Sequence, residues 1–293
     1  MKRTGAPARG PFSSRPRPGR RRPVRPRAAR GAGPPAGVLV SGGLDSAVLL
    51  RAALRRHRRV RPLYVRAGLH WEGVEQASLR RFLRAMSQPG LEPLATLDVP
   101  MTDLIGGHWS ATGRGTPGYD DGDASVYIPG RNIALFAKAA TFCALDGIGV
   151  LISGILSANP FPDGRPAFLR AIERALSLGL GTRLAIRTPF RGLTKDRVVR
   201  MGRDLPLHLT FSCINPSRGR HCGDCCKCKE RIDAFRAARV ADRTVYAGGP
   251  DAAAGPSRSP GDAAPNVPPP SAGLRAARRA RRRAAPNSPA RVR

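Results

Sequence analysis

Acidic residues are scarce in this chain of 293 residues, which has 20 Asp and Glu against 51 Lys and Arg and a formal net charge of +31. Residues 1–36 contain no acidic residue, and residues 244–293 contain only two. Both segments are also poor in apolar residues, so burial could not offset the entropy that they would lose on ordering. We therefore expect two disordered basic tails, 1–36 and 244–293, around one globular α/β domain.

Long apolar segments are missing as well. The sequence has neither the apolar core of a secretory signal nor a run long enough to span a membrane, so we expect no membrane partner and a cytoplasmic location. Aromatic residues make up 5% of the chain, and the tails hold only Phe12 and Tyr246. Without interleaved aromatic side chains the tails offer no surface on which bases stack. Their positive charge makes nucleic acid a possible partner, but we do not favour it.

A glycine loop is the strongest feature of the sequence. The apolar run 38–40 is typical of a buried parallel strand, and Ser-Gly-Gly-Leu-Asp-Ser follows at 41–46, where a helix begins. Glycines let a ligand approach the backbone, and a helix N-terminus offers free N–H groups to phosphate. The spacing of a Walker loop or a dinucleotide loop is absent. The six residues instead resemble the PP-loop of the N-type ATP pyrophosphatases, which cleave ATP between the α and β phosphates.

Strands alternate with helices along the rest of the domain. Apolar runs predict strands at 60–65, 94–99, 149–154 and 184–186, and helical periodicity predicts helices at 71–86, 133–145, 167–178 and 195–202. Such an order predicts right-handed crossovers and a parallel sheet, with ligands at the carboxyl ends of the strands. Residues 101–125 show little periodicity, and we interpret them as a lid or binding loop.

Polar residues follow several of these strands. Arg131 and Asn132 come after a Pro-Gly turn and could bind a nucleotide, although Asn132 as a helix N-cap is an equally good interpretation. Asp163 and Arg165 lie in a proline-rich loop as a fixed acceptor and donor, with a surface ion pair as the alternative. Lys195 in a first helical turn opposes the helix dipole, which suits a lysine that binds an anion. A solvated lysine is the simpler interpretation.

Five of the six cysteines lie in a short segment near the end of the domain. The spacing selects a four-thiolate set of Cys213, Cys222, Cys225 and Cys228. Four sulfurs fit a closed structural zinc site, and an iron–sulfur cluster is the competing interpretation. Cys226 could replace Cys225, whereas Cys143 is expected in the core. We accordingly divide the domain into an ATP-binding part, 37–205, and a zinc-binding segment, 206–243.

The order of these motifs resembles the 7-cyano-7-deazaguanine synthase family of queuosine precursor biosynthesis. The likeness covers roughly residues 37–240 and includes Pro-Gly-Arg-Asn, Phe-Pro-Asp-Gly-Arg-Pro, Thr-Lys before a helix, and Ser-Cys with C-x2-C-x2-C. It implies an ATP-dependent ligase in which a 7-deazaguanine carboxylate is adenylated and ammonia displaces AMP. A further ATP-dependent activation then yields the nitrile. The implied fold is a doubly wound sheet of the adenine nucleotide alpha hydrolase type with a small C-terminal zinc-binding helical subdomain.

The resemblance also assigns roles to residues of this chain. It implies catalytic roles for Asp45, Ser46 and Lys195 and substrate binding by Asp163 and Arg165. The implied nucleotide-binding residues are Val40, Ser41, Gly42, Gly43, Leu44, Asp45, Ser46, Arg131 and Asn132. ATP, Mg2+ and Zn2+ are the implied cofactors, ammonia is the second substrate, and a homodimer is left open.

The chain departs from the family pattern in two places. The family usually reads Tyr-Pro-Asp-Cys-Arg-Pro where this chain has Phe161 and Gly164, after a shorter loop, 155–160, that lacks the usual acidic residue. Residues 68–72 replace a Gly-Gln-Arg-His stretch. Two alternatives therefore stay open: a PP-loop adenylating enzyme that acts on another carboxylate, and a tRNA-binding thiolation-type enzyme. The latter would need a redox-active cysteine or cluster near the ATP site.

Overall fold

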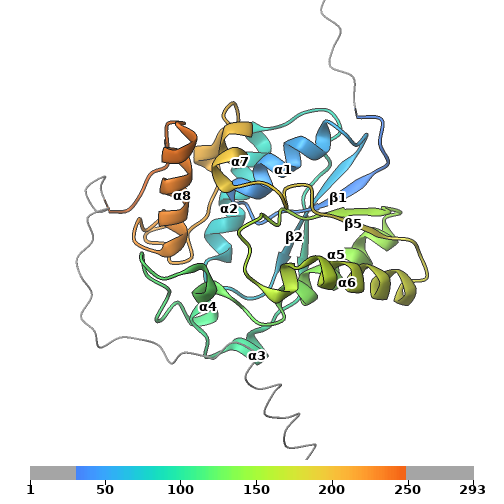
Figure 1. Cartoon of the computed structure of the whole chain (residues 1–293), viewed down its shortest axis with the longest axis horizontal. Coiled ribbons are helices and arrows are strands. Elements are labelled where there is room, and N and C mark those ends of the chain that lie inside the picture. Colours follow the sequence, from blue (N-terminus) through green and yellow to red (C-terminus); the bar gives the residue numbers. More distant parts are fainter. Residues whose placement is uncertain (1–30, 249–293) are drawn as a thin grey trace, which may run out of the picture.

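A five-stranded parallel sheet forms the centre of the chain in a computed structural model that describes residues 31–248. The strands are ordered β3-β2-β1-β4-β5, and Figure 1 labels β1, β2 and β5 among them. Their bounds are β1 Ala36–Leu39, β2 Val60–Arg66, β3 Ala95–Asp98, β4 Val150–Ile152 and β5 Ala185–Arg187. Every neighbouring pair is parallel, so the predicted doubly wound parallel sheet is confirmed.

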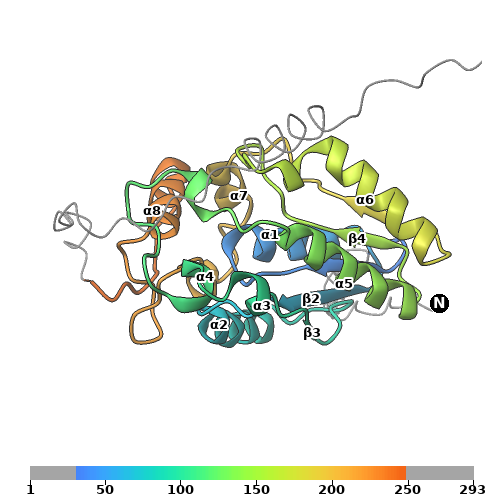
Figure 2. The same cartoon turned by 90° about the horizontal axis from the view of Figure 1, so that it is seen from below.

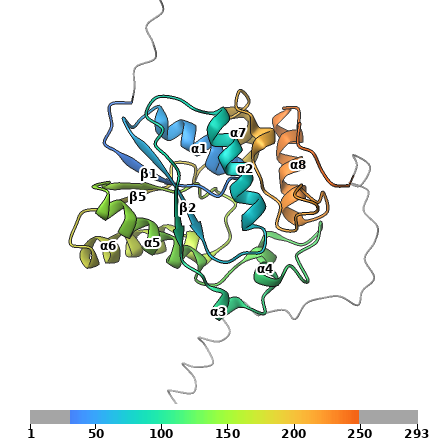
Figure 3. The same cartoon turned by 180° about the vertical axis from the view of Figure 1, so that it is seen from behind.

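Helices cover both faces of the sheet. Helices α1, α2 and α7 lie on one face and α5 and α6 on the other (Figures 1 and 3). The longer helices are α1 Leu44–Leu54, α2 Glu72–Ala85, α5 Arg131–Leu145, α6 Pro166–Gly179, α7 Lys195–Met201 and α8 Cys226–Ala238. Single helical turns are α3 Thr102–Ile105, α4 Trp109–Thr112, η1 Asp123–Val126, η2 Pro162–Gly164 and η3 Leu207–Leu209.

The strands are buried on both faces because their side chains alternate between two apolar clusters. In β2, Tyr64 packs in the cluster beneath α1 and α2, whereas its neighbours Leu63 and Val65 pack beneath α5 and α6. This arrangement explains why the strands read as unbroken apolar runs. Cys143 on α5 belongs to the second cluster and is fully buried, as predicted.

From β1 the chain adds β2 and β3 on one side of the sheet and then β4 and β5 on the other, so the strand order reverses between β1 and β4. The chain leaves β1 for α1 on one face of the sheet and leaves β4 for α6 on the other. The loops after these two adjacent strands therefore diverge, which opens a crevice at their carboxyl ends. The loop at 41–46 lies at this point.

A third layer closes the carboxyl end of the sheet. Helix α8 packs against α7 at the same end of the molecule as α4 and the loop before α5 (Figure 2). A separate buried cluster joins Trp71 and Trp109 to the cysteine segment. Residues 101–125, which the sequence presents as an irregular loop, thus contain helical turns that pack on this cluster.

The contacts of the folded domain extend beyond the bounds 37–243 that the sequence indicates. The amide of Gly33 donates to the carbonyl of Arg56, and the ring of Tyr246 packs edge-on against His221. These contacts extend the domain at each end into residues that we assigned to the tails. The rest of both tails lies outside the described residues. Within residues 31–248, none of the helices is long and apolar enough to cross a membrane, and the cytoplasmic location stays a prediction.

Gly37 in β1 allows helix α5 to approach the sheet closely. A Cβ at this position would lie 2.7 Å from Sγ of Cys143 and 3.0 Å from Cδ1 of Leu63, both fully buried. We therefore predict that Gly37→Ala lowers the free energy of unfolding by about 1–3 kcal/mol through overpacking, measured by urea denaturation. Gly73→Ala on the exposed side of α2, where a Cβ meets nothing within 4 Å, is the control. Equal stability of both variants would contradict the close packing.

Candidate nucleotide and metal sites

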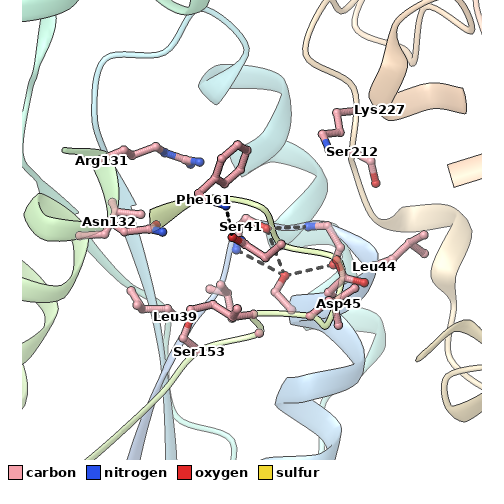
Figure 4. A pocket seen from close by; sticks show the side chains of 18 of the residues that line it. Leu39, Ser41, Leu44, Asp45, Arg131, Asn132, Ser153, Phe161, Ser212 and Lys227 are labelled. Atoms are coloured by element: carbon pink, nitrogen blue, oxygen red, sulfur yellow. Dashed lines mark hydrogen bonds between the residues drawn. The ribbon is translucent and has the colours of Figure 1, made fainter. Parts of the chain in front are cut away.

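A cavity of about 400 Å3 lies at the reversal point of the sheet (Figure 4). The ends of β1, β2 and β4 form its floor, and the first turns of α1, α5, α7 and α8 surround it. The predicted residues that line it are Val40, Ser41, Gly43, Leu44, Asp45, Ser46, Arg131, Asn132 and Lys195. The fold thus brings together residues that are more than 150 positions apart in the sequence.

The glycine loop has a turn that its own residues fix. Gly42 has a φ of 79°, and a Cβ there would lie 3.2 Å from the carbonyl oxygen of Glu75, so the position favours glycine on both grounds. The Ser46 hydroxyl donates to the carbonyl of Gly43 (3.0 Å) and accepts from the amide of Ser41 (3.3 Å). The amide of Gly43 donates to the Ser41 hydroxyl, and the first helical hydrogen bond runs from Ala47 to Gly43. The amides at 44–46 therefore have no partner within the helix and are available to a phosphate.

Lys195 joins the loop to two other elements. Its Nζ lies 3.2 Å from Oδ2 of Asp45 and 2.8 Å from Oε1 of Glu230 on α8. Burial lowers the pKa of this lysine, but the two carboxylates outweigh burial and hold the pKa above its usual value, so the ammonium stays charged. The solvated lysine is therefore the wrong interpretation of the two, because Lys195 is an ion-paired residue of the cavity.

Glu230 binds a second lysine with its other oxygen. Its Oε2 lies 3.0 Å from Nζ of Lys227, which also contacts Oδ1 of Asp123 at 3.0 Å. Burial raises the pKa of Glu230, but the ammonium groups of Lys195 and Lys227 dominate and bring that pKa to about 2. Asp45 and four charged side chains from α7, α8 and η1 thus form a row of ion pairs along the cavity.

A buried carboxyl lies beneath the glycine loop. Glu75 on α2 accepts a hydrogen bond of 2.5 Å from the hydroxyl of Tyr64, and both residues line the cavity. Burial raises the pKa of Glu75 to about 7, while the hydrogen bond from Tyr64 and the charge of Arg131 act in the opposite direction. Burial and the nearby carboxylate likewise raise the pKa of Tyr64.

Two buried polar atoms, one at the start of α5 and one on η2, have no partner in the part of the chain that the structure describes. Nε of Arg131 and Oδ1 of Asp163 are buried and have no hydrogen-bond partner among the described residues. The helix is capped by Gly130, whose φ is 73°, so Asn132 is not the N-cap that we considered. Instead, the amide of Asn132 donates to Oδ2 of Asp163 at 3.4 Å, which ties the two loops together.

Both implied substrate residues lie outside the cavity lining. Asp163 is buried behind Asn132, and burial raises the pKa of its carboxyl. Arg165 is exposed at the start of α6, and no ion pair joins it to Asp163 in the described part of the chain. Phe161 does line the cavity, and its ring stacks on Tyr127 with centroids 5.1 Å apart. The substrate role of Asp163 and Arg165 stays a prediction.

The four selected cysteines converge on one point. Sγ of Cys213 lies 3.5 Å from that of Cys222 and 3.8 Å from that of Cys225, and Cys222 lies 3.8 Å from Cys228. A tetrahedral ion that binds each sulfur at about 2.3 Å separates the sulfurs by about 3.8 Å, so the donor set fits a single metal ion. Amides of Asn215, Cys222 and Asp224 donate to these sulfurs, and hydrogen bonds of this kind orient the ligands of a metal ion.

Cys226 is not part of this group, so the geometry favours Cys225 over Cys226 as the fourth sulfur. Cys225 precedes α8 as its N-cap, whereas Cys226 is the first residue of the helix. All six cysteines lie within the described residues, and none of them lines the nucleotide cavity. A thiolation chemistry that needs a cysteine beside the bound nucleotide therefore has no such residue in this cavity.

Several cavity residues were not predicted from the sequence. Tyr64, Glu75, Lys227 and Glu230 all line the cavity. Lys227 and Glu230 lie in a segment that we interpreted only by its cysteines. Glu75 carries a weak signal, since it is a carboxyl on the helix that follows the second strand, but nothing in the helical pattern distinguishes a buried carboxyl from a solvated one.

A glycine loop at the reversal point of a doubly wound sheet, faced by lysine and arginine side chains, defines a nucleotide-binding domain of the PP-loop class. A family model described as "Queuosine biosynthesis protein QueC" matches residues 36–239. This chain belongs to the queuosine biosynthesis protein QueC family.

Similar proteins agree with this family. A 7-cyano-7-deazaguanine synthase of Anaeromyxobacter sp. (strain Fw109-5) is 34% identical over 224 residues, which cover 71% of this chain and 94% of that protein. The protein of the same description from Methanosphaerula palustris is 30% identical over 225 residues, 71% of this chain and 97% of its own. A 4-thiouridine synthetase solved with RNA and ATP is 17% identical and has a TM-score of 0.41, over 70% of this chain and 53% of its own. That likeness is too remote to bear on function.

The cysteine geometry gives a prediction that separates two adjacent residues. We expect Cys225→Ala to lose the bound metal and to melt at a lower temperature, because metal binding is coupled to folding. Cys226→Ala should keep the metal content of the wild type. Elemental analysis of the purified proteins and thermal denaturation measure both effects. The reverse result, with metal lost only from the Cys226 variant, would contradict the assigned ligand set.

The raised pKa of Glu75 predicts a pH dependence of stability. The folded state holds the Glu75 proton more tightly than the unfolded state, so the free energy of unfolding should fall as the pH rises from about 4.5 to about 7. The loss amounts to at most about 3 kcal/mol. Glu75→Gln, which cannot ionise, should lose less stability than the wild type between pH 5 and pH 8 in urea denaturation. The exposed Asp103→Asn should behave as the wild type; a wild-type slope in the Glu75 variant would refute the prediction.

Proposed function

We propose that this chain is an ATP-dependent ligase that converts 7-carboxy-7-deazaguanine and ammonia into 7-cyano-7-deazaguanine. A carboxylate oxygen attacks the α phosphorus of ATP, and pyrophosphate leaves. Ammonia then attacks the acyl carbon, and AMP leaves with the carboxylate oxygen to give an amide. A second ATP activates the amide oxygen in the same way, and loss of AMP and protons gives the nitrile. The similar proteins named above carry the name of this activity.

The single observation that carries the proposal is the position of the glycine loop at the carboxyl end of β1, with Lys195 beside it. In the proposed reaction the amides at the start of α1 and the hydroxyls of Ser41 and Ser46 hold the departing pyrophosphate. Lys195 exchanges part of its contact with Asp45 for the phosphate oxygens and neutralises their charge. Stabilising the charge that develops on a leaving group is among the largest contributions to catalysis.

On the other side of the cavity Arg131 provides a second cation. Its buried Nε has no partner among the described residues, so the guanidinium can bind a phosphate oxygen without breaking another hydrogen bond. The ring of Phe161, stacked on Tyr127, offers an apolar face to a planar heterocycle. Because Phe161 stands where the family usually has Tyr, another aromatic carboxylate is the second candidate substrate. Substrate contacts by Asp163 and Arg165 would require a movement of their loop.

We assign zinc to the cysteine site. The sulfur separations of 3.5–3.8 Å fit one tetrahedral ion, whereas a cluster places sulfide and several iron atoms between its thiolates. All four coordination positions are taken by protein sulfur, so the ion has a structural role.

Mg2+ would neutralise part of the charge of the phosphates. Asp45 is the carboxylate of the glycine loop, and its buried Oδ1 has no partner among residues 31–248. A cytoplasmic location and a homodimer remain proposals.

The proposal is tested by incubating the full-length protein with ATP, Mg2+, ammonium and 7-carboxy-7-deazaguanine. We expect mass spectrometry to detect the nitrile together with AMP and pyrophosphate. Asp45→Asn, which removes the charge beside Lys195 at nearly unchanged volume, should lower kcat/KM by about 100-fold or more. Asp103→Asn on the exposed turn α3 is the matched control.

Two results would contradict this assignment. Full activity of Asp45→Asn would exclude the loop as the site of ATP cleavage. A folded, metal-loaded protein that binds ATP but makes no nitrile would leave the nucleotide site intact and refute the deazaguanine substrate.

A further inference from the structure

Five charged residues of the cavity form one connected chain that reaches from the glycine loop to the cysteine-containing residues 206–243, which we call the metal segment. Asp45 contacts Lys195, Lys195 contacts Glu230, Glu230 contacts Lys227, and Lys227 contacts Asp123 on η1, each at 2.8–3.2 Å. All five residues line the cavity. The proposed function uses the first two of them, and Lys227 remains without a role.

Lys227 occupies a position that local energetics do not favour. It is the second residue of α8, where the helix dipole opposes a positive charge, and its side chain is only 23% exposed. Lys229, two residues further along the same helix, is 41% exposed, contacts Asp120 at 3.4 Å and lies over the ring of Tyr119. Lys229 does not line the cavity. The side chain of Lys227 is thus directed into the cavity, whereas that of Lys229 is directed to the surface.

The charge balance of the cavity depends on Lys227. Its basic lining residues are Arg131, Lys195 and Lys227, and its acidic lining residues are Asp45, Glu75, Asp123 and Glu230. The raised pKa of Glu75, about 7, leaves three of these groups as carboxylates at lower pH. Without Lys227, two cations would face these three carboxylates in a site that must hold a polyphosphate. Figure 4 places Lys227 and Ser212 across the cavity from Arg131 and Asn132. A phosphate chain in the cavity would therefore lie between Arg131 and Lys227.

We propose that Lys227 binds the pyrophosphate portion of the nucleotide, so that the metal segment supplies a phosphate ligand to the ATP site. The inference rests on the proposed function. Glu230 and Asp123 hold the ammonium of Lys227 in place before the nucleotide arrives, and phosphate oxygens replace the Asp123 carboxylate when it binds. An ammonium already fixed by its neighbours loses less side-chain entropy on binding.

The cysteine site positions this lysine. Cys225 caps α8, and its carbonyl accepts the amides of Cys228 and Lys229 at 2.9 and 3.0 Å. Lys227 lies between Cys225 and Cys228, so the tetrahedral arrangement of their sulfurs fixes the backbone that carries it. Arg231 on the next turn is fully buried and donates to Ser212, another cavity residue. The metal segment thereby acts on the nucleotide site through the orientation of α8.

The test compares Lys227→Met with Lys229→Met in the full-length, metal-loaded protein. Isothermal titration calorimetry with ATP, pyrophosphate and AMP, each with Mg2+, measures the dissociation constants. Loss of a charge-assisted hydrogen bond should weaken ATP and pyrophosphate binding to Lys227→Met by about 10- to 100-fold. AMP binding should change less than about twofold, because AMP lacks the pyrophosphate. Lys229→Met should bind all three as the wild type does.

Several outcomes would overturn the inference. Equal affinities of the two methionine variants for ATP would exclude a contact between Lys227 and phosphate. Equal weakening of AMP and pyrophosphate binding would indicate a general distortion of the cavity. If Lys227→Met loses its metal, Lys227→Arg decides: it keeps the charge and should bind pyrophosphate within about threefold of the wild type, and a larger loss would refute the role. A wild type that does not bind ATP would refute the proposed function itself.

Discussion

The ion pairs of Lys195 are the interaction on which the nucleotide site depends. One ammonium group joins Asp45 at the start of α1 to Glu230 on α8, and therefore joins the glycine loop to the metal segment. The three helices that meet there come from distant parts of the chain and share no backbone hydrogen bonds of a sheet. The side chains of Lys195, Asp45 and Glu230 are 20–31% exposed, and their ion pairs add to the apolar contacts by which the same helices pack in one cluster. The bridge therefore helps to fix the relative positions of the helices. Lys195 binds one carboxylate oxygen of Glu230, and Lys227 binds the other.

Most of the fold could be predicted because its determinants are local. Unbroken apolar runs and helical periodicity identify strands and helices, and their alternation requires a parallel sheet whose ligands bind at the carboxyl ends. The glycine loop and the four cysteines are similarly visible, since each needs particular residue types at fixed spacing. The boundaries were less accurate: contacts of Gly33 and Tyr246, which lie far from their partners in sequence, extend the domain beyond 37–243.

The rest of the site could not be predicted because it depends on packing between distant elements. Glu75 is buried only because α2 lies beneath the turn at Gly42, and its carboxyl would be ordinary on a solvated helix. Lys227 reaches the cavity because the metal segment folds over the loop. Arg165 follows a family motif but is exposed outside the cavity lining, and its substrate role stays a prediction. Motif spacing identifies the residues of a loop, but only the packed structure determines which side chains face the ligand.

Oxygen tracing tests the central claim, adenylation of a carboxylate, most directly. Both carboxylate oxygens of 7-carboxy-7-deazaguanine are labelled with oxygen-18, and the products of turnover are analysed by mass spectrometry. If each activation forms a bond between a substrate oxygen and the α phosphorus, each AMP should carry one labelled oxygen and the pyrophosphate none. Label in pyrophosphate or phosphate, or nitrile formation with unlabelled AMP, would contradict cleavage of ATP between its α and β phosphates by the substrate.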